Sequence, residues 1–465
     1  MICQMSSIID TTMSDSSPLA VRVITLGCAK NLVDAEVMCG SLAVNGFVLT
    51  TDPELADITL VNTCSFISDA RKEAEEAIKA ALAWKAGGPT RKVLVSGCLP
   101  QRDPQECARL YPAVDLFLGL DDVPVIHSKL AALYSEPQKP ALPSAALPSY
   151  LYNHETPRIC VTPEPYAYIK ISEGCNHHCA FCAIPGIRGK LRSREQDSIL
   201  AECEQLLAQG VKEINFVAQD STSYGKERGD SLLALLRRCE ELPGDFWLRL
   251  LYTHPLHVNE ELFELMAHGK HLVPYLDMPL QHISDHILSD MRRGMSSAQT
   301  RALLQMLREK YPQITLRSTF MVGFPGETEQ DFQELLAFIK DIRFERMGAF
   351  VYSPEKGTPA LQLPNKPVKS SIAKKRHHIL LKEQQRISLE NNKRLSGQVM
   401  RILIEGASNL DEFYGRSVMD APEVDQLIYF TEPEEDCIQG YDFVNVRIRS
   451  CTPYHLRGKL LREKK

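Results

Sequence analysis

The chain has 465 residues, 44% of them hydrophobic, with 14 cysteines and a formal net charge of -6. This composition excludes a disordered or fibrous protein, predicts about three domains with their own cores, and gives no general case for nucleic-acid binding. The chain opens without a basic segment followed by an apolar run, and nowhere do about 18 apolar residues occur together, so we expect a cytoplasmic protein without signal peptide or membrane span. The cytoplasm is reducing, so cysteines there are more often metal ligands than members of a disulfide framework.

Three apolar runs near the start of the chain are predicted to be buried parallel strands. They span residues 21–26, 58–61 and 92–95, and Cys28, Cys64 and Cys98 follow them closely. Helical patterns at 33–44 and 68–86 supply the crossovers. Because the carboxyl ends of parallel strands meet at one edge of a sheet, we expect the three thiols to converge there and to hold a metal cluster. Ordinary buried cysteines at strand ends are the alternative.

A segment rich in Pro, Ala and Ser follows this predicted domain. We place the first domain at residues 20–134 and an extended linker at 135–160, with the low-periodicity stretch reaching 165. Cys160 is predicted to have no metal role.

The next motif places three cysteines within eight residues. Cys175, Cys179 and Cys182 have the spacing C-x3-C-x2-C, which can hold three corners of a cubic iron-sulfur cluster and leaves the fourth iron open for chemistry. The alternative is a zinc site that uses these cysteines with His177 or His178. No second cysteine pair of the zinc-ribbon type follows, which favours the cluster.

Strands and helices then alternate about six times in a predicted domain at 161–396. The expected strands are residues 166–171, 213–217, 247–252, 275–278, 315–322 and 347–352. Thr328 and Asp331 form a capping-box start for the last helix between these strands. Six units are too few for a closed eight-stranded barrel.

The last predicted domain, 397–465, has alternating strands at 400–404, 426–430 and 443–448, typical of a small antiparallel barrel. Between Glu405 and Asp442 the sequence holds 11 carboxylates and one cation, Arg416. We expect this surface to repel phosphate and attract a basic protein. Basic residues occur in the helical segment 366–394 and in the tail 457–465.

Several of these segments resemble one protein family. The C-x3-C-x2-C motif resembles the signature of radical S-adenosylmethionine (SAM) enzymes. Residues 26–34 (LGCAKNLVD), 62–67 (NTCSFI) and 96–102 (SGCLPQR) resemble the amino-terminal cluster domain of the methylthiotransferases, and the last domain resembles the TRAM domain. Within that family, residues 30–34 and the Phe66-Ile67 pair resemble the branch that modifies a small-subunit ribosomal protein. The branch that modifies tRNA typically has Gln-Met-Asn after its first cysteine.

The resemblance implies an α/β fold: a parallel α/β cluster domain, a central partial (β/α)6 radical SAM barrel and an all-β OB-like TRAM domain. It implies two 4Fe-4S clusters, one on Cys28, Cys64 and Cys98 and a catalytic one on Cys175, Cys179 and Cys182, together with SAM. The implied reaction adds a methylthio group to an aspartate β-carbon of small-subunit ribosomal protein twelve, free or ribosome-bound, with RNA contact secondary. The sequence identifies neither the electron donor nor the sulfur source.

Candidate SAM contacts follow from the resemblance and from the rule that such active sites lie at the carboxyl ends of strands. They are Gln219 and Asp220 after one strand, the turn of Gly323, Gly326 and Glu327 after another, and Arg192 or Arg194 in the basic run behind the cluster motif. Ordinary turns and a solvated basic surface are the alternatives. His254, His257 and His282 are assigned no catalytic role.

Three other functions remain as alternatives. A tRNA adenosine methylthiotransferase would share the clusters and SAM, but the acidic last domain and Lys30-Asn31 argue against it. A two-cluster electron carrier would need no open iron, and a structural zinc protein would contain zinc without iron.

Overall fold

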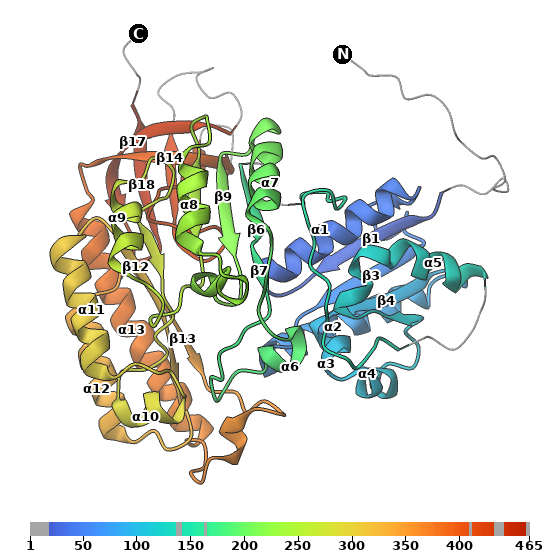
Figure 1. Ribbon diagram of the computed structural model, residues 1–465, viewed down its shortest axis with the longest axis horizontal. Helices are drawn as coiled ribbons and strands as arrows, with labels where there is room; N and C mark the ends of the chain where they lie inside the picture. Colours follow the sequence, from blue (N-terminus) through green and yellow to red (C-terminus); the bar gives the residue numbers. More distant parts are fainter. Residues whose placement is uncertain (1–17, 136–141, 162–164, 409–411, 432–440, 462–465) are drawn as a thin grey trace.

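The computed structural model describes residues 18–135, 142–161, 165–408, 412–431 and 441–461. The chain forms two α/β domains that lie side by side, with a small β-barrel packed on the second of them (Figure 1). The predicted fold class is therefore confirmed. None of the helices in the described part of the chain is both long and apolar enough to cross a membrane.

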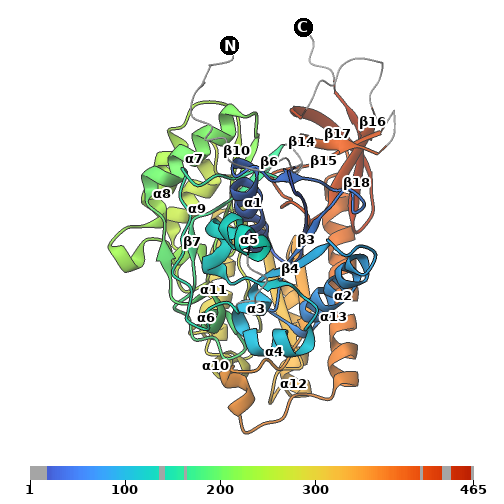
Figure 2. The same ribbon diagram turned by 90° about the vertical axis from the view of Figure 1, so that its right-hand side faces the viewer.

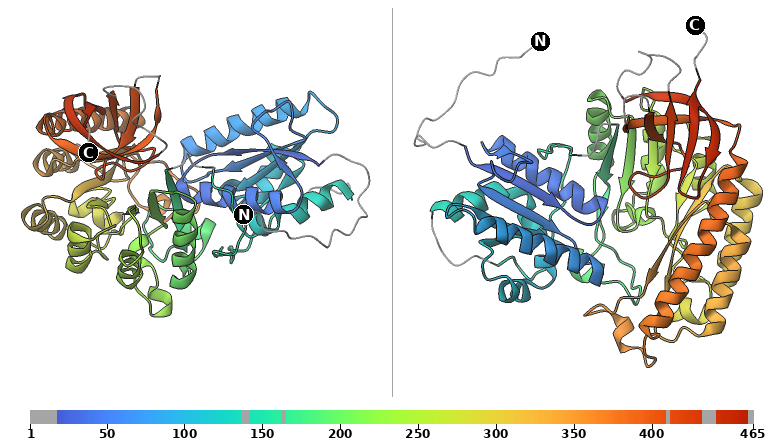
Figure 3. Two further views of the ribbon diagram at one scale, coloured as in Figure 1. Left: turned by 90° about the horizontal axis from the view of Figure 1, so that it is seen from above. Right: turned by 180° about the vertical axis from the view of Figure 1, so that it is seen from behind.

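The amino-terminal domain is a five-stranded parallel sheet of order β2-β1-β3-β4-β5. Side chains alternate between its faces: Leu60 packs with Val33 of α1, whereas Val61 packs with Ile78 of α2. Both faces are thus covered, as Figure 3 shows from above. The strands are β1 (Ala20–Thr25), β2 (Val48–Leu49), β3 (Ile58–Thr63), β4 (Lys92–Gly97) and β5 (Leu116–Phe117), and the helices are α1 (Ala29–Val44), α2 (Ser68–Lys85), α3 (Cys98–Arg102), α4 (Pro104–Leu110), η1 (Leu120–Val125) and α5 (Ile126–Ser135).

The central domain contains two three-stranded parallel sheets, β10-β9-β6 and β11-β12-β13. A parallel bridge between Leu248 and Leu272 joins them into one open, curved arrangement of six strands. The strands are β6 (Tyr166–Lys170), β9 (Glu213–Val217), β10 (Trp247–Leu250), β11 (Tyr275–Asp277), β12 (Thr315–Val322) and β13 (Arg346–Val351), with a separate pair, β7 (Ser172–Glu173) and β8 (Arg192–Ser193). The six predicted strands match these six within one or two residues at each end.

Helices cover the outer face of the central strands (Figure 1). The helices of this domain are α6 (Ile184–Arg188), α7 (Gln196–Ala208), η2 (Ser221–Ser223), η3 (Lys226–Arg228), α8 (Leu232–Glu240), α9 (Glu260–His268), α10 (Asp285–Asp290), α11 (Ser297–Lys310), α12 (Glu329–Ile342), η4 (Pro359–Gln362) and α13 (Ser370–Arg394), of which α6 lies at the boundary with the amino-terminal domain (Figure 1). The capping box predicted for α12 is present, because Thr328 Oγ1 accepts from Asp331 N and Asp331 Oδ2 accepts from Thr328 N. Helix α13 packs on β13 and leads into the barrel (Figure 2).

The carboxyl-terminal barrel closes in the order β14-β15-β16-β18-β17. Its strands are β14 (Val399–Ala407), β15 (Glu412–Arg416), β16 (Leu427–Thr431), β17 (Phe443–Cys451) and β18 (His455–Leu460). The sequence predicted three of them and missed β15 and β18. Gly415 lies inside β15, where a Cβ would come within 2.1 Å of Leu403 O on the neighbouring strand.

The described part of the linker, residues 142–161, has no helix or strand, as predicted, but it is more than a spacer. Tyr152 is buried and its hydroxyl donates to Glu202 of α7. Arg158 pairs with Glu36 of α1 at 2.6 Å and with Glu202 at 2.5 Å. The linker therefore fastens the first two domains to each other; residues 136–141 and 162–164 lie outside the described part.

The described acidic side chains of the barrel make contacts that the sequence did not predict. Each carboxylate between residues 405 and 442 that the structure describes has a partner within the chain: Glu405 with Arg416, Glu412 with Arg457, Asp420 with Arg346, Glu423 with the Tyr166 hydroxyl, Asp425 with Arg317 and Asp442 with Lys212. These six carboxylates thus make intramolecular contacts, while the Asp442 side chain is still 66% exposed; attraction of a basic protein by this domain stays a prediction. The other five (Asp411, Glu432, Glu434, Glu435 and Asp436) and the end of the basic tail, 462–465, lie outside the described residues.

A buried ion-pair cluster attaches the barrel to the central sheet. Glu213, at the start of β9, accepts from Arg416 of the barrel at 2.5 Å and from Arg249 of β10 at 2.7 Å, and none of the three is exposed to solvent. Burial alone would raise the pKa of Glu213, but the two guanidinium groups outweigh it and lower that pKa.

We predict that Glu213→Gln lowers the free energy of unfolding by about 3–5 kcal/mol, because it leaves buried guanidinium charge uncompensated. Since folding lowers the pKa of Glu213, its contribution is complete above the ordinary value of 4.5 and is lost as the pH falls through the folded value. Urea unfolding at pH 7 measures the difference. Glu260→Gln, which breaks the surface pair of Glu260 with Lys310, is the control and should leave the unfolding midpoint unchanged; an equal effect of both variants would contradict the assignment.

Candidate active site

The loop with Cys175, Cys179 and Cys182 is closed at its base by the antiparallel pair β7 and β8. Gly174, between β7 and the first cysteine, has φ 75°, and a Cβ there would lie 2.1 Å from Lys190 O. Only glycine allows these two backbone segments to approach this closely. Cys175 N donates to Gly189 O at 3.1 Å and completes the closure, so the loop projects as a unit from the end of the first central strand.

Cys175, Cys179 and Cys182 are hereafter called the loop cysteines. Their sulfur atoms lie in a mostly buried environment with a few hydrogen-bond donors. Burial raises the pKa of Cys175 to about 11 and that of Cys182 to about 12. The backbone N–H of His177 donates to Cys175 Sγ at 3.4 Å, and Arg293 donates to Cys179 Sγ at 3.2 Å. The two donors around these sulfur atoms suit an anionic metal-thiolate group.

The spread of these sulfur atoms does not fit a single zinc ion. A tetrahedral zinc site would bring its sulfur ligands to about 3.8 Å from one another. Within the described residues, the group whose ligand atoms all lie within 4.8 Å of one another consists of His177, His254 and His257 and includes no cysteine. The loop cysteines thus suit a larger group, such as a cubic cluster, better than the zinc alternative.

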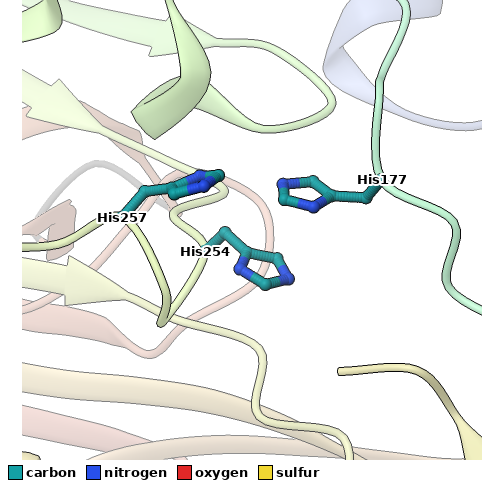
Figure 4. A group of neighbouring side chains, drawn as sticks. All are labelled: His177, His254 and His257. Carbon is teal, nitrogen blue, oxygen red and sulfur yellow. The ribbon is translucent and has the colours of Figure 1, made fainter. Parts of the chain in front are cut away.

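The three histidines gather beside the cluster loop, His177 from the loop itself and the other two from the segment after β10 (Figure 4). The ring centroids of His177 and His254 are 4.0 Å apart and the ring planes differ by 13°. The nitrogen lone pairs lie in these nearly parallel planes, so they do not converge on a shared metal ion. Asp220 accepts from His177 Nε2 at 2.7 Å and contacts His257 Nδ1 at 3.2 Å. These contacts outweigh burial and hold the pKa of Asp220 far below its usual range, so this carboxylate orders the loop.

The amino-terminal cysteines Cys28, Cys64 and Cys98 converge at the carboxyl edge of their sheet, as predicted. A Cβ on Gly27, which precedes the first cysteine, would lie 2.5 Å from Cys64 Cβ. Gly97, before the third, also has a positive φ and touches the segment that leads to Cys64. Burial raises the pKa of Cys98 to about 12, although the nearby Arg188 guanidinium acts to lower it.

Residues 30–34, which carry the resemblance to one branch of the family, dock this edge onto the central domain. Lys30 Nζ lies 3.4 Å above the Tyr252 ring and also reaches Ala218 O. Asp34 pairs with Lys170 of β6 and, at 2.9 Å, with Arg188 of α6. The motif therefore holds the two cysteine sets face to face.

A cavity of about 340 Å³ opens at the cluster loop. Both domains form its walls: Cys179, Cys182 and His178 come from the loop, Ile187 from α6, Arg102 from α3 and Lys356 from the segment after β13. Its volume lies in the range of small-molecule sites, about 300–1,000 Å³.

Comparisons with known proteins agree with this arrangement. A model of the radical SAM superfamily matches residues 169–339, one described as Uncharacterized protein family UPF0004 matches 20–119, and one of the TRAM domain matches 397–461. The ribosomal protein uS12 methylthiotransferase RimO of Syntrophotalea carbinolica is 44% identical over 447 residues, which are 95% of this chain and 97% of that protein. The protein of the same name from Pelobacter propionicus is 41% identical over 96% of this chain and 99% of its own. The chain belongs to the RimO family.

A solved structure outside the RimO family shares the fold. The radical S-adenosylmethionine methyltransferase TsrM from Kitasatospora setae, with tryptophan and a SAM analogue bound, superposes with a TM-score of 0.56 at 15% identity, over 80% of this chain and 89% of that one. At this identity the likeness concerns the fold alone.

For this RimO-family chain, the predicted SAM contacts fall into different environments. Gln219 donates to Glu173 at 3.1 Å and leaves its buried Oε1 without a partner, next to Asp220 and the cluster loop. Arg192 donates to Arg188 O and Lys190 O, so it stabilises the backbone that follows the loop cysteines.

The glycine turn after β12 is explained by packing. A Cβ on Gly323 would lie 2.6 Å from Ala373 Cβ of α13, and Gly326 faces Asn365. The fully buried Glu327 accepts from Gly323 N and lies 3.3 Å from Arg376 of α13. The turn thus anchors α13, and its contact with SAM stays a prediction.

The structure gives Arg194 a role other than the predicted one. Its guanidinium is buried, pairs with Glu202 at 2.6 Å and stacks on Tyr152 at 4.0 Å. These contacts place it in the domain attachment with the linker, because a buried guanidinium keeps its counter-charge. Its contact with SAM stays a prediction.

Two arginines make contacts with cysteine sulfur atoms that the sequence did not predict. Arg293 donates to Cys179, and Arg188 lies 3.5 Å from Cys98 Sγ. Arg188 lies in the basic run behind the cluster motif, but its contact with Cys98 was not predicted. The sequence separation of 114 and 90 residues explains why no local pattern could identify either contact.

We predict that Gly174→Ala disrupts the cluster loop. The positive φ alone costs a side chain about 1–3 kcal/mol, and the contact with Lys190 O adds to it. The expected result is a lower iron content after anaerobic reconstitution. Gly186→Ala is the matched control, because a Cβ at that position of α6 meets nothing within 4 Å; equal iron in both variants would contradict the prediction.

Proposed function

We propose that this chain is a radical SAM methylthiotransferase that adds a methylthio group to an aspartate β-carbon of ribosomal protein uS12. The observation that carries the proposal is the pair of three-cysteine sets at facing edges of two parallel sheets, in a chain similar over nearly its whole length to proteins named for this activity. A β C–H bond beside a carboxylate is too weak an acid for a general base, which is why the reaction needs radical chemistry.

The loop cysteines are proposed to hold a 4Fe-4S cluster with one iron open to SAM, and such a cluster, once reduced, supplies with SAM a radical able to abstract hydrogen from carbon. The chain's own part is to place and shield this group. Arg293 donates to the Cys179 sulfur, and Asp220 holds His177 in the loop. The unpartnered Gln219 Oε1 supports its predicted contact with SAM.

Cys28, Cys64 and Cys98 are proposed to hold the second cluster, at which the sulfur is supplied. Lys30 and Arg188 outweigh the effect of burial and lower the pKa of Cys28, so this set presents one readily ionised thiol among three. Thiolates are the form in which cysteines bind metal. The docking of the two domains then provides the proximity between the two clusters that the transfer requires.

The cavity at the loop suits the aspartate substrate. Three cations, Arg102, Arg292 and Lys356, line it. Arg102 pairs with Glu355 and Lys356 with Asp103, whereas Arg292 has no ion-pair partner among the described residues. A free guanidinium beside the reacting site is the group that best recognises a carboxylate.

We predict that the two cysteine sets each account for half of the bound iron. Replacement of Cys175, Cys179 and Cys182 by Ala should leave about four of about eight irons per chain, and replacement of Cys28, Cys64 and Cys98 should do the same. Iron analysis after reconstitution measures this. Cys160→Ala is the control and should retain all the iron. Complete loss of iron on replacement of either cysteine set alone would contradict the prediction that the chain holds two independent clusters.

The activity is tested by offering purified uS12 and bulk tRNA in parallel to reconstituted protein with SAM, reductant and sulfide under anaerobic conditions. Mass spectrometry should detect a methylthio gain on an aspartate of uS12 and none on tRNA. Cys175→Ala should abolish the gain, whereas Glu260→Gln, which changes an exposed ion pair outside the cavity lining, should preserve it. A gain on tRNA adenosine alone would refute the proposed substrate.

A further inference from the structure

Arg188 lies between the two cysteine sets and belongs to the opposite domain from the one it contacts. It ends α6, six residues after Cys182 in the cluster loop. Its side chain is only 2% exposed, and Nη2 lies 3.5 Å from Cys98 Sγ of the amino-terminal domain. A residue of the radical SAM loop therefore donates to a sulfur of the other set.

One carboxylate from each domain fixes this guanidinium. Nη1 donates to Glu173 at 2.8 Å, and Nη2 donates to Asp34 at 2.9 Å. Glu173 immediately precedes Gly174 and the first loop cysteine, whereas Asp34 lies on α1, whose N-cap is Cys28. Lys170 pairs with both carboxylates, so two cations and two anions balance within this network of four charges. The orientation of Arg188 is thus set from both sides.

The charge of Arg188 lies against the amino-terminal cysteine set, since Nη2 is 3.5 Å from Cys98 Sγ. Hydrogen bonds to sulfur and nearby charge are among the factors that set the reduction potential of an iron-sulfur cluster. A fixed cation favours the more negative, reduced state.

We propose that Arg188 is a positioning residue through which the radical SAM loop sets the geometry and the reduction potential of the iron-sulfur group on Cys28, Cys64 and Cys98. This inference rests on the proposed second cluster. Its consequence is that the amino-terminal cluster acquires its working potential only when the two domains are docked with Asp34 and Glu173 on either side of Arg188. Cluster chemistry in one domain is thereby coupled to the position of the other.

Arg158 offers a matched control. It is buried like Arg188 and also bridges the first two domains, through Glu36 of α1 and Glu202 of α7. It makes no hydrogen bond to any of the six cysteines in the described structure. A conservative change at Arg158 therefore weakens domain docking without removing a donor from sulfur.

The experiment uses the full chain with Cys175, Cys179 and Cys182 replaced by Ala, so that iron is bound only at the amino-terminal set. Arg188→Lys or Arg158→Lys is then added, and the reduced fraction is followed by electron paramagnetic resonance during a redox titration. Lysine keeps the charge that Asp34 and Glu173 require, but its single nitrogen replaces the two separate nitrogens that Arg188 uses, Nη1 towards Glu173 and Nη2 towards Asp34 and Cys98 Sγ, so the contact with sulfur is lost. Loss of a hydrogen bond to a charged group predicts about a tenfold lower ratio of reduced to oxidised cluster at fixed potential for Arg188→Lys. Arg158→Lys should leave the ratio within the error of the titration.

Each outcome decides the matter. An unchanged ratio in Arg188→Lys, or the same shift in both variants, would overturn the inference, since docking alone would then explain the effect. Loss of iron from Arg188→Lys but not from Arg158→Lys would support it, whereas loss from both would overturn it. The double variant Arg188→Gln with Asp34→Asn removes one charge of each sign and should lower the ratio in the same direction. A parent variant that binds no iron would instead refute the proposed second cluster itself, which separates the two failures.

Discussion

The arrangement of this molecule depends on a buried network of four charges between its first two domains. Asp34 comes from one domain, and Lys170, Glu173 and Arg188 come from the other. Burying charge is expensive, and it is tolerated only where each group keeps its counter-charges. That condition is met only when the domains are docked in one orientation, so the network specifies how the two cysteine-bearing edges meet.

Other features of the site follow from this orientation. Each set of cysteines occupies the carboxyl edge of a parallel sheet, the place where α/β folds bind ligands. Gly27 and Gly174 let the cysteine loops approach their neighbours more closely than any side chain would allow. The docked domains then enclose a cavity whose walls carry cations from both sides. A reaction that must join a sulfur source to a carbon radical needs this proximity and this exclusion of water.

The sequence predicted much of the fold because its strands are regular in composition. The runs that became β9 and β12 were placed at their observed bounds. In the barrel the prediction was weaker, since Gly415 lies inside β15 and Gly458 inside β18, and glycine is depleted in strands. Ion pairs of the acidic residues in that domain could not be predicted either. Composition counts charges, but Asp420 and Arg346 neutralise each other across a domain contact that composition does not record.

By itself the sequence determined the chemistry, because the spacing of Cys175, Cys179 and Cys182 and the placement of three further cysteines after strands are local features. Only the tertiary structure decided which charges meet those sulfur atoms. Arg188 and Cys98 are 90 residues apart, and Arg293 and Cys179 are separated by 114. Local periodicity specifies which face of a helix or strand is buried, whereas contacts between distant side chains depend on how whole domains pack.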